Sequence, residues 1–441
     1  MANPADPDVT ALLTVRQAID ILDAAPVFPR VVRLPLAQCR GHRLAQDLFT
    51  DRDYPPFEKS LMDGYAVQAA DVRQTPTELA VVGVVPAGQW PERAIEAGQT
   101  MAVMTGAPMP PGSNATVPVE QTEEVGSAGD TVRILKPVAA GYAVAKQASD
   151  VAGGQLVLSS GAMLEAPAIA VAATVGAAEL NVYARPRVAV LGTGDEIIPI
   201  HQTPTAAQIR NSNNPMLVAL LQRLGCDVTD LGIVPDDPSA IRAALEQGLS
   251  FDALFVTGGM SMGQFDYVPR TLVELGVQLK ITKVRVKPGK PFVFGTNKSA
   301  ETNVVSADMS APGSSPGTQR SALNTFVFGL PGNPLSAFVC TLRLASRVLA
   351  RVAGGMPQER WLTGRLDAGL PANGPREFYQ PVLFRAASGM KSAQNELPSI
   401  EPLLWRGSAD VFTLARANAL LVRPENEPTL PKGTMVRVLE I

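Results

Sequence analysis

Lysine residues gather in one short stretch of a chain that contains few of them elsewhere. The sequence has 10 lysines in 441 residues, and four of them, Lys280, Lys283, Lys287 and Lys290, lie within 11 residues. The stretch from Thr282 to Val286 is β-like, and side-chain alternation along it places Lys283 and Lys287 on the same face. The cluster indicates an anionic ligand, although a solvated basic strand would have the same pattern.

Four glycine-rich loops lie where a ligand could approach the backbone. They comprise residues 192–196, 257–266, 287–291 and 329–336. Ligands of parallel α/β sheets bind beyond the carboxyl ends of the strands, and glycine lets the backbone come close to them. In the last loop, Asn333 and Pro334 suit the start of a helix, whose free N–H groups would face an anion. One such loop is weak support for a site, but four at one sheet edge predict one.

Carboxylates occur in the same loops. Asp195 and Glu196 follow the first predicted strand, and Asp266 ends the second loop. With bound phosphate, these side chains would suit a divalent cation. The simpler alternatives are solvated loop carboxylates at Asp195 and Glu196 and a helix N-cap at Asp266. The residues alone therefore predict phosphate or oxyanion binding with Mg²⁺.

Strands and helices that alternate after Arg185 would position these loops. Strands are expected at 187–191, 228–234, 251–257 and 326–330, and helices at 215–224, 237–248, 266–275 and 334–353. Asn214 is the expected N-cap of the first helix, and Asp237-Pro238 opens the second. This order predicts a parallel α/β sheet. Residues 298–324 interrupt it with six serines and no aromatic residue, which predicts a flexible insertion.

The remaining sequence predicts β-rich regions and two further helices. Short β-prone runs at 79–85, 116–119 and 131–135 indicate a β-rich segment, and a second small β domain is expected from about residue 361 to the end. Thr14 and Gln17 form a capping box for a helix that ends near Pro26. A helix over 166–178 carries Pro167 in its first turn.

Composition excludes several classes of function. The net charge of −3 argues against general affinity for nucleic acid. Three distant cysteines and two histidines provide neither a disulfide framework nor a histidine-based zinc site. The N-terminus lacks a signal-peptide pattern, and the longest weakly polar run, 166–178, is too short to cross a bilayer. We expect a cytoplasmic protein that binds neither nucleic acid nor membrane.

Six motifs resemble the MoeA family of molybdopterin molybdenumtransferases, which includes the E domain of gephyrin. They are Met62-Asp63-Gly64-Tyr65-Ala66, Met104-Thr105-Gly106-Ala107-Pro108, Thr193-Gly194-Asp195-Glu196, the Gly-Gly-x-Ser-x-Gly loop from Gly258 to Asp266, Lys287-Pro288-Gly289-Lys290-Pro291, and Gly-Leu-Pro-Gly-Asn-Pro-x-Ser at 329–336. They occur in the family's order over nearly the whole chain, so the resemblance is specific.

The resemblance implies an elongated, multidomain homodimer of α/β plus β class. Its domains would be a split helical domain at 8–50 and 149–184, a β-rich domain at 51–148, a MogA-like parallel α/β domain at 185–356 and a C-terminal β-barrel at 357–441. It also implies small-molecule substrates, with a MogA-type adenylyltransferase and molybdoenzymes as partner proteins.

The same resemblance implies insertion of molybdate into the dithiolene of adenylylated molybdopterin, with AMP released by Mg²⁺-dependent hydrolysis of the pyrophosphate. Asp63, Glu196 and Asp266 would be catalytic, and the last two would also hold Mg²⁺. The molybdate would be held by Lys287, Lys290 and Ser336, and the pterin phosphates in part by Lys283. The other substrate-binding residues would be Thr105, Asp150, Gly258, Gly259, Ser261, Gly332, Asn333, Arg376 and Ser408.

Some positions depart from the family pattern. Ala145 begins a stretch that is often arginine-rich, Asn211 replaces an aspartate, and Gln380 replaces an arginine, for which Arg376 is a candidate substitute. Two alternatives to the transferase therefore stay open. One is a non-catalytic pterin-binding or scaffold homologue. The other is a MogA-like molybdopterin adenylyltransferase, although that family lacks the two β domains.

Overall fold

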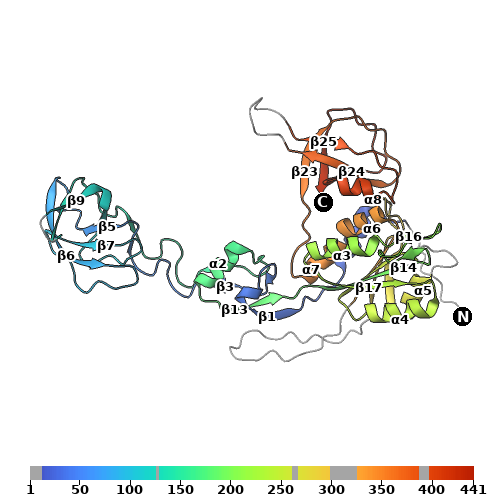
Figure 1. Cartoon of the computed structure of the whole chain (residues 1–441), viewed down its shortest axis with the longest axis horizontal. Coiled ribbons are helices and arrows are strands. Elements are labelled where there is room, and N and C mark those ends of the chain that lie inside the picture. The colour runs from blue at the N-terminus through green and yellow to red at the C-terminus, as the bar shows by residue number, and fades with distance from the viewer. Residues whose placement is uncertain (1–11, 126–128, 261–266, 298–324, 387–396) are drawn as a thin grey trace. The chain divides into compact units, whose positions relative to one another are not determined.

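The chain divides into two compact units in a computed structural model that describes residues 12–125, 129–260, 267–297, 325–386 and 397–441 (Figure 1). One unit contains residues 1–32, 41–43 and 182–441, and we call it the α/β–barrel unit. The other contains residues 33–40 and 44–181, and we call it the β-rich unit.

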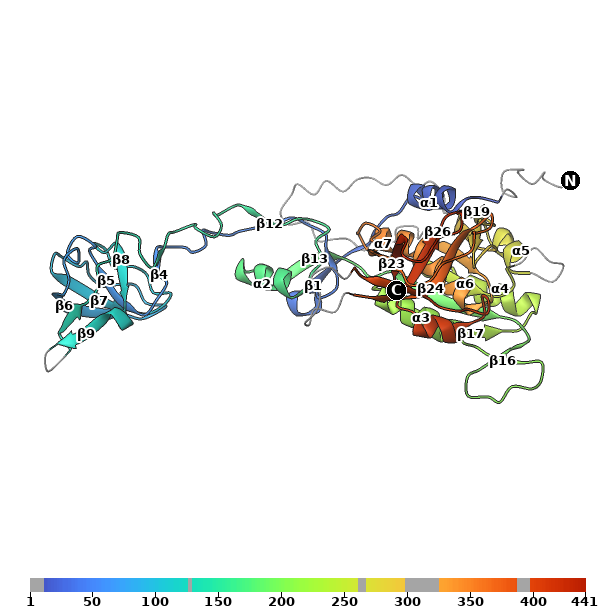
Figure 2. The same ribbon diagram turned by 90° about the horizontal axis from the view of Figure 1, so that it is seen from above.

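The β-rich unit is built on a six-stranded sheet with the order β8-β5-β7-β6-β10-β9 (Figure 2). Its strands are β5 (Gly64–Val67), β6 (Thr77–Val85), β7 (Gln99–Val103), β8 (Ala115–Pro118), β9 (Thr122–Val125) and β10 (Thr131–Ile134). Val67, Val117 and Val132 are fully buried in its core. The three strands predicted from the sequence are confirmed as β6, β8 and β10.

Shorter elements complete this part of the chain. They are β1 (Val31–Pro35), η2 (Leu36–Gln38), β2 (Arg43–Leu44), β3 (Leu48–Phe49), β4 (Lys59–Ser60), η3 (Val119–Gln121), β11 (Val144–Ala145), β12 (Leu156–Leu158), α2 (Ala166–Thr174) and β13 (Glu179–Tyr183). Helix α2 begins as predicted, with Pro167 in its first turn. It ends at Thr174 and not at residue 178, because Gly176 takes a left-handed φ of 76° that stops the helix.

A second six-stranded sheet, in the order β17-β14-β18-β22-β21-β19, forms the centre of the α/β–barrel unit. Its strands are β14 (Arg187–Thr193), β17 (Asp227–Val234), β18 (Ala253–Thr257), β19 (Val277–Ile281), β21 (Val293–Asn297) and β22 (Phe326–Leu330). The four predicted strands are β14, β17, β18 and β22, and they pair in parallel as expected. Strands β19 and β21 were not predicted, and β21 runs antiparallel to both of its neighbours.

Helices cover both faces of this sheet, with α4 and α5 on one side and α3, α6 and α7 on the other (Figure 1). Their bounds are α3 (Asn213–Arg223), α4 (Pro238–Gly248), α5 (Tyr267–Glu274), α6 (Pro334–Cys340), the π-helical η4 (Thr341–Ala345) and α7 (Ser346–Val352). Asp237 caps α4 as predicted. The prediction that Asn214 caps α3 is wrong. The cap position is Ser212, and the Asn214 side chain instead donates to Asp230 at 2.7 Å.

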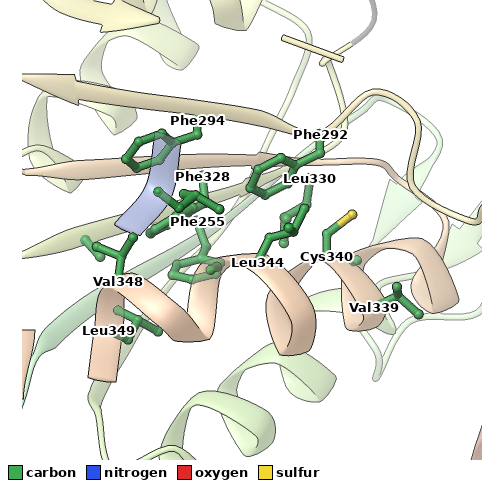
Figure 3. Close-up of a cluster of buried hydrophobic side chains, with 14 of the residues drawn as sticks. Phe255, Phe292, Phe294, Phe328, Leu330, Val339, Cys340, Leu344, Val348 and Leu349 are labelled. Carbon is green, nitrogen blue, oxygen red and sulfur yellow. The ribbon is translucent and has the colours of Figure 1, made fainter. Parts of the chain in front are cut away.

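Aromatic side chains fill the space between the sheet and the α6–α7 run (Figure 3). Phe255, Phe294 and Phe328 are fully buried and face Leu344 and Val348 of the helices. Each such side chain stabilises the fold by about 1.5–3 kcal/mol. Helix α1 (Val15–Ala24) adds its apolar face to the same core, and its predicted capping box is present. In the part of the chain described, no helix has the length and apolarity needed to span a membrane.

The C-terminal strands close into a barrel with the order β24-β25-β23-β27-β26, because β26 also pairs with β24. They are β23 (Trp361–Leu366), β24 (Glu377–Arg385), β25 (Ser399–Pro402), β26 (Ala419–Arg423) and β27 (Met435–Glu440), and α8 (Val411–Arg416) lies between β25 and β26. The two-residue strand β20 (Val286–Lys287) pairs with β24 in parallel. The barrel is therefore joined to the lysine-rich segment by backbone hydrogen bonding.

The predicted β-like stretch from Thr282 to Val286 is only partly correct. Before Val286 the backbone forms no regular strand, since the Val284 N–H donates to the Lys290 carbonyl and the Arg285 N–H to that of Leu13. The predicted alternation nevertheless holds. Val284 and Val286 are buried, whereas Lys283 and Lys287 are half-buried.

Candidate active site

Two loops meet in the crevice where the strand order of the α/β sheet reverses. From β14 the chain crosses to β17 on one side and then to β18 on the other, so the loops after β14 and β18 flank the switch point of the sheet, where such sheets bind their ligands. We call the place where these loops meet the crevice. Gly258 has a φ of 88°, and a Cβ atom there would lie 2.3 Å from the Thr193 carbonyl oxygen. A Cβ on Gly259 would lie 2.9 Å from Thr193 Oγ1. Only glycine permits this approach.

The loop after β22 joins the same crevice. A Cβ on Gly332 would lie 4.0 Å from Gly258 Cα, and Asn213 Nδ2 donates to the Gly332 carbonyl at 2.6 Å. Thr193 Oγ1 and Asn213 Oδ1 are buried here without a hydrogen-bond partner among the described residues. Buried polar groups are nearly always satisfied, so unsatisfied atoms at a glycine-lined crevice suit a site that receives a ligand.

Lys287 is held by aromatic rings of the barrel. Its Nζ lies 4.6 Å from the centroid of the Phe378 ring and 5.7 Å from that of the Trp405 ring. A cation–π contact orients an ammonium group and leaves its charge unneutralised. Within the described ranges, neither Lys287 nor Lys283 nor Lys290 forms an ion pair, whereas many arginines do. The lysine cluster thus keeps its positive charge available.

The lysine-bearing loop rests on helix α6. Gly289 has a φ of 124°, and a Cβ atom there would lie 2.5 Å from Cys340 Sγ. Cys340 donates a weak hydrogen bond to the Gly289 carbonyl at 3.6 Å. Burial raises the pKa of the Cys340 thiol, so it is a neutral packing group. A Gly289 Cβ would also lie 3.7 Å from the Ser336 carbonyl oxygen, so the loop lies along α6 from Ser336, which is 3% exposed, to its last residue, Cys340.

Ser408 of the barrel reaches the start of α6. Asn333 occupies the N-cap position, and its Nδ2 donates to Ser408 Oγ at 2.9 Å. The Leu335 N–H donates to the Ser408 carbonyl at 3.1 Å. The expectation of free N–H groups at this helix start is therefore wrong for Leu335, because the barrel satisfies that donor.

A buried network fixes the barrel strand that carries Phe378. Arg343 Nε donates to the Tyr379 hydroxyl at 2.7 Å, and that hydroxyl donates in turn to Glu377. Burial raises the pKa of Tyr379, so the phenol stays protonated. The Glu377 N–H donates to the Arg285 carbonyl, which places Arg376 beside the lysine segment along the backbone. Gln380, one of the departures from the family pattern, is 9% exposed in the barrel wall.

The Thr-Gly-Asp-Glu loop presents its two carboxylates differently. Glu196 folds back over Gly194, where a Cβ atom would lie 2.5 Å from Glu196 Oε2. Asp195 Oδ1 accepts from the Asp236 N–H at 3.0 Å. The described residues contain no group of three or more His, Cys, Asp or Glu side chains that could hold a metal. Ser261 and Asp266 lie outside the described residues, so the Mg²⁺ site stays a prediction.

The remaining predicted residues lie in the β-rich unit. Asp63 Oδ1 accepts hydrogen bonds from the Thr105 N–H at 2.6 Å and from the Thr105 hydroxyl at 2.9 Å. These two bonds hold the pKa of Asp63 below its usual value. Asp150 accepts a longer bond from the Ser149 hydroxyl at 3.3 Å. The two motif loops that contain Asp63 and Thr105 are thus joined to each other, as a functional pair would be.

Sequence reasoning missed the aromatic rings around Lys287. No local pattern connects Trp405 or Phe378 to a lysine in another domain. Asn213 was missed as a site residue as well, although it ends Ile209-Arg210-Asn211-Ser212-Asn213, the stretch in which Asn211 replaces an aspartate of the family. The signal that could have found Trp405 is its position three residues before Ser408, a predicted site residue.

Comparisons with known proteins agree with this geometry. The family description "MoeA N-terminal region (domain I and II)" matches residues 13–176, "Probable molybdopterin binding domain" matches 189–351, and "MoeA C-terminal region (domain IV)" matches 363–441. A Haemophilus influenzae protein named molybdopterin molybdenumtransferase is 30% identical over 97% of this chain and 98% of its own length. The chain belongs to the MoeA family.

Other MoeA proteins are similar over the same span. A Staphylococcus aureus molybdopterin molybdenumtransferase is 31% identical over 97% of this chain and 95% of its own. The crystal structure of the molybdopterin biosynthesis MoeA protein from Pyrococcus horikoshii OT3 is 25% identical, with a TM-score of 0.76 over 98% of this chain and 100% of that one. Membership in the MoeA family makes this protein a transferase of molybdenum cofactor biosynthesis, and not a MogA-like adenylyltransferase.

Proposed function

We propose that the protein inserts molybdate into the dithiolene of adenylylated molybdopterin and releases AMP by hydrolysis of the pyrophosphate. The proposal is supported by lysines that form no ion pair among the described residues and by a glycine-lined crevice whose buried Thr193 Oγ1 and Asn213 Oδ1 have no hydrogen-bond partner there. A dianion and a pyrophosphate are the kinds of ligand that such a charge distribution attracts.

Lys287, Lys290 and Ser336 would hold the molybdate. The rings of Phe378 and Trp405 restrict Lys287, so little side-chain freedom is lost when its ammonium meets an oxyanion. The exposed Lys290 lies on the same loop, and this loop packs on the α6 turn that contains Ser336. Two ammonium groups would balance the charge of the molybdate dianion, and the hydroxyl would donate a hydrogen bond to it. None of these groups would distinguish molybdate from another tetrahedral dianion.

The phosphates would lie in the crevice at Gly258, Gly259 and Gly332, with Lys283 at its border and Asn333, Arg376 and Ser408 as further contacts. Mg²⁺ would polarise the pyrophosphate when bound, and Glu196 and Asp266 are the residues that we propose hold it. Mg²⁺ is commonly held by one or two carboxylates together with substrate phosphates, so these two carboxylates would be enough. Glu196 would then orient the water that attacks the pyrophosphate.

Asp63, Thr105 and Asp150 would act from the β-rich unit of a second subunit in a homodimer. A mixing experiment tests this arrangement. Lys287→Ala and Asp63→Ala are each expected to be nearly inactive alone. A mixed dimer regains one intact site only if the two residues act from different subunits. Activity that fails to return after verified subunit exchange would show that both residues act from one chain or that dimerisation is irrelevant.

AMP release is the direct test of the function. Purified protein with adenylylated molybdopterin, molybdate and Mg²⁺ should release AMP, and omission of molybdate or Mg²⁺ should abolish the release. Binding of the nucleotide without turnover would instead support the scaffold alternative. We further propose that the protein works in the cytoplasm, receives its substrate from a MogA-type adenylyltransferase and supplies molybdoenzymes.

A further inference from the structure

A cluster of buried polar side chains is attached to the barrel strand β24. Arg343 Nε donates to the Tyr379 hydroxyl at 2.7 Å, and this hydroxyl donates to Glu377. Arg343 also pairs with Glu359, and these two side chains are only 14% and 18% exposed. We call Arg343, Glu359, Glu377 and Tyr379 the Arg343 cluster. None of its residues belongs to the substrate-binding set proposed above.

The Arg343 cluster is better suited to fixing geometry than to adding stability. Charges are costly to remove from water, and well-packed apolar residues of similar volume often stabilise a protein as well as a buried ion pair does. A planar guanidinium, in contrast, presents its donors in a fixed fork, so its partners are held in one arrangement. Arg343 uses different nitrogens for Tyr379 and Glu359, which ties β24 to the segment that leads into β23.

Strand β24 carries this cluster on one face and the aromatic contact of Lys287 on the other. Side chains alternate along a strand, so Glu377 and Tyr379 point away from Phe378. Tyr379 is fully buried in the core that includes the α6–α7 run. On the other face, the centroid of the Phe378 ring lies 5.3 Å from that of the Trp405 ring and 4.6 Å from Lys287 Nζ. A shift of β24 would therefore move the ring that orients the lysine.

The backbone of the lysine segment depends on the same strand. β20 has two residues, and its pairing with β24 places Val286 opposite Glu377 and Lys287 opposite Phe378. The Glu377 N–H also donates to the Arg285 carbonyl at 3.0 Å. Two residues form too few hydrogen bonds to hold a strand in place by themselves. Both the backbone and the side chain of Lys287 thus take their position from β24.

Arg343 and Ser336 lie on one helical run. Ser336 lies in α6, and Arg343 lies in the π-helical turn η4, which follows α6 without a break. π-helical turns are rare, and they occur frequently at functional sites. The side chain that fixes β24 and the hydroxyl proposed for the molybdate therefore belong to one continuous helix.

We propose that Arg343 and Tyr379 are positioning residues of the oxyanion site. Neither needs to contact the substrate. They hold β24 in the place where Phe378 keeps the Lys287 ammonium directed at the molybdate. The inference rests on the proposed function, because it takes Lys287 and the molybdate from it. It implies that damage to the Arg343 cluster weakens the binding of molybdate and leaves the rate at saturating molybdate close to that of wild type.

Isothermal titration calorimetry of the full-length protein with molybdate alone tests the proposal. Tyr379→Phe deletes the hydroxyl and keeps the ring in the core, and it should raise the Kd for molybdate about fivefold. Arg343→Lys keeps the charge but loses the planar fork, and it should raise the Kd by a similar factor. In the AMP-release assay, both variants should show a raised KM for molybdate and an almost unchanged kcat.

A double-mutant cycle shows whether the effect passes through the aromatic contact of the lysine. Phe378→Leu removes the ring and should itself weaken the binding of molybdate. If Tyr379 acts through Phe378, then Tyr379→Phe should change the Kd by less than about twofold in the Phe378→Leu background. The same fivefold loss in both backgrounds would show a general structural role and overturn the proposal.

Asp252→Asn controls for the loss of a buried ion pair. Asp252 pairs with Arg30 and precedes the first residue of β18, whereas the crevice lies beyond the last. This variant should melt at a lower temperature and bind molybdate as wild type does. An equal loss of affinity in Asp252→Asn would overturn the proposal.

The binding data also separate this proposal from the function itself. An unchanged Kd in folded Tyr379→Phe and Arg343→Lys, or a wild type that binds no molybdate, would overturn the positioning role. If the Kd values follow the expected order but no AMP is released in the transferase assay, the proposed function fails and the positioning role stands.

Discussion

The glycine crevice of the α/β sheet and the Asp63–Thr105 loops both carry motifs of the family. Their polar groups differ in whether hydrogen bonds within the protein already satisfy them. Asp63 accepts two hydrogen bonds from Thr105, and these lower its pKa. In the glycine crevice, by contrast, Thr193 Oγ1 and Asn213 Oδ1 have no hydrogen-bond partner within the described ranges. Lys287 faces aromatic rings and has no counter-ion there.

This difference indicates a division of labour between the two regions. A group whose hydrogen bonds are made within its own unit is preorganised and needs no ligand to complete it. Groups that are left buried and unsatisfied, or charged and unpaired, gain most when a ligand arrives. We therefore expect the crevice to supply binding energy for the anions, and Asp63 to act on a substrate that is already bound.

Lys287→Ala should have the largest effect among the variants that test this division. It removes a fixed positive charge from the proposed molybdate site, and loss of one such group typically costs about 10²–10³ in rate. The rate of AMP release at limiting molybdate measures it. Lys432→Ala, an exposed lysine of the same unit, is the matched control and should behave as wild type. Equal activity of the two variants would remove Lys287 from the site.

Gly258→Ala should come next, because it separates the two loops that form the crevice. Its methyl group would approach the Thr193 carbonyl oxygen to 2.3 Å, and a φ of 88° is strained for alanine. A displacement of this size in a positioning element costs about 100-fold in rate. Gly225→Ala, also at positive φ but with open space at the Cβ position, controls for backbone strain alone. Full activity of Gly258→Ala would show that the close approach is unnecessary.

Trp405→Ala should raise the KM for molybdate about fivefold while kcat changes little, since a cation–π contact is worth about 1 kcal/mol. Trp405→Phe retains an aromatic face and should recover most of the loss. A purely structural role for Trp405 would instead lower the melting temperature and leave KM unchanged in the folded fraction.

Thr105→Val tests the other side of the comparison. It removes one of the two hydrogen bonds to Asp63, so the pKa of Asp63 should rise towards its ordinary value of 3.8 and remain well below neutrality. Carboxyl-detected NMR titration measures the shift. Because Asp63 stays ionised, the pH–rate profile around neutrality should keep its shape. A pKa that does not move would show that the backbone N–H alone sets it.

Replacement of residues 299–323 by a short turn should have the smallest effect. The Asn297 N–H donates to the Thr325 carbonyl at 3.0 Å. Asn297 ends β21 and Thr325 directly precedes β22, whereas the site loop follows the other end of β22. The two points of attachment are therefore at the sheet edge opposite the crevice. Activity and thermal stability close to wild type are expected. A large loss of activity would mean that the segment contributes to the site.

Much of the α/β fold was predictable because its signals are local. The Thr14–Gln17 capping box, the Asp237-Pro238 helix start and the apolar run from Phe326 to Leu330 each specify their element within a few residues. The antiparallel strand β21 was not predictable in this way. It pairs with β22, which follows only after residues 298–324. No hydrophobic periodicity in the sequence indicates that pairing.

The candidate site was predictable in its loops and not in its contacts. Glycines after strands and a lysine cluster placed the crevice at the carboxyl edge of the sheet. The contacts of Lys287 with Phe378 and Trp405 arise because β20 pairs with β24 of the barrel, and a two-residue strand gives no propensity signal. The hydrogen bond from the Leu335 N–H to the Ser408 carbonyl could not be predicted either, because it also joins segments that are far apart in the sequence.

Anomalous diffraction at the molybdenum absorption edge, from crystals soaked in molybdate, tests the central claim most directly. We predict one dominant peak within hydrogen-bonding reach of Lys287 Nζ and near Lys290 and Ser336, and its loss in Lys287→Ala crystals of the same form. A dominant peak elsewhere on the protein, or a peak that persists unchanged in Lys287→Ala, would contradict the account.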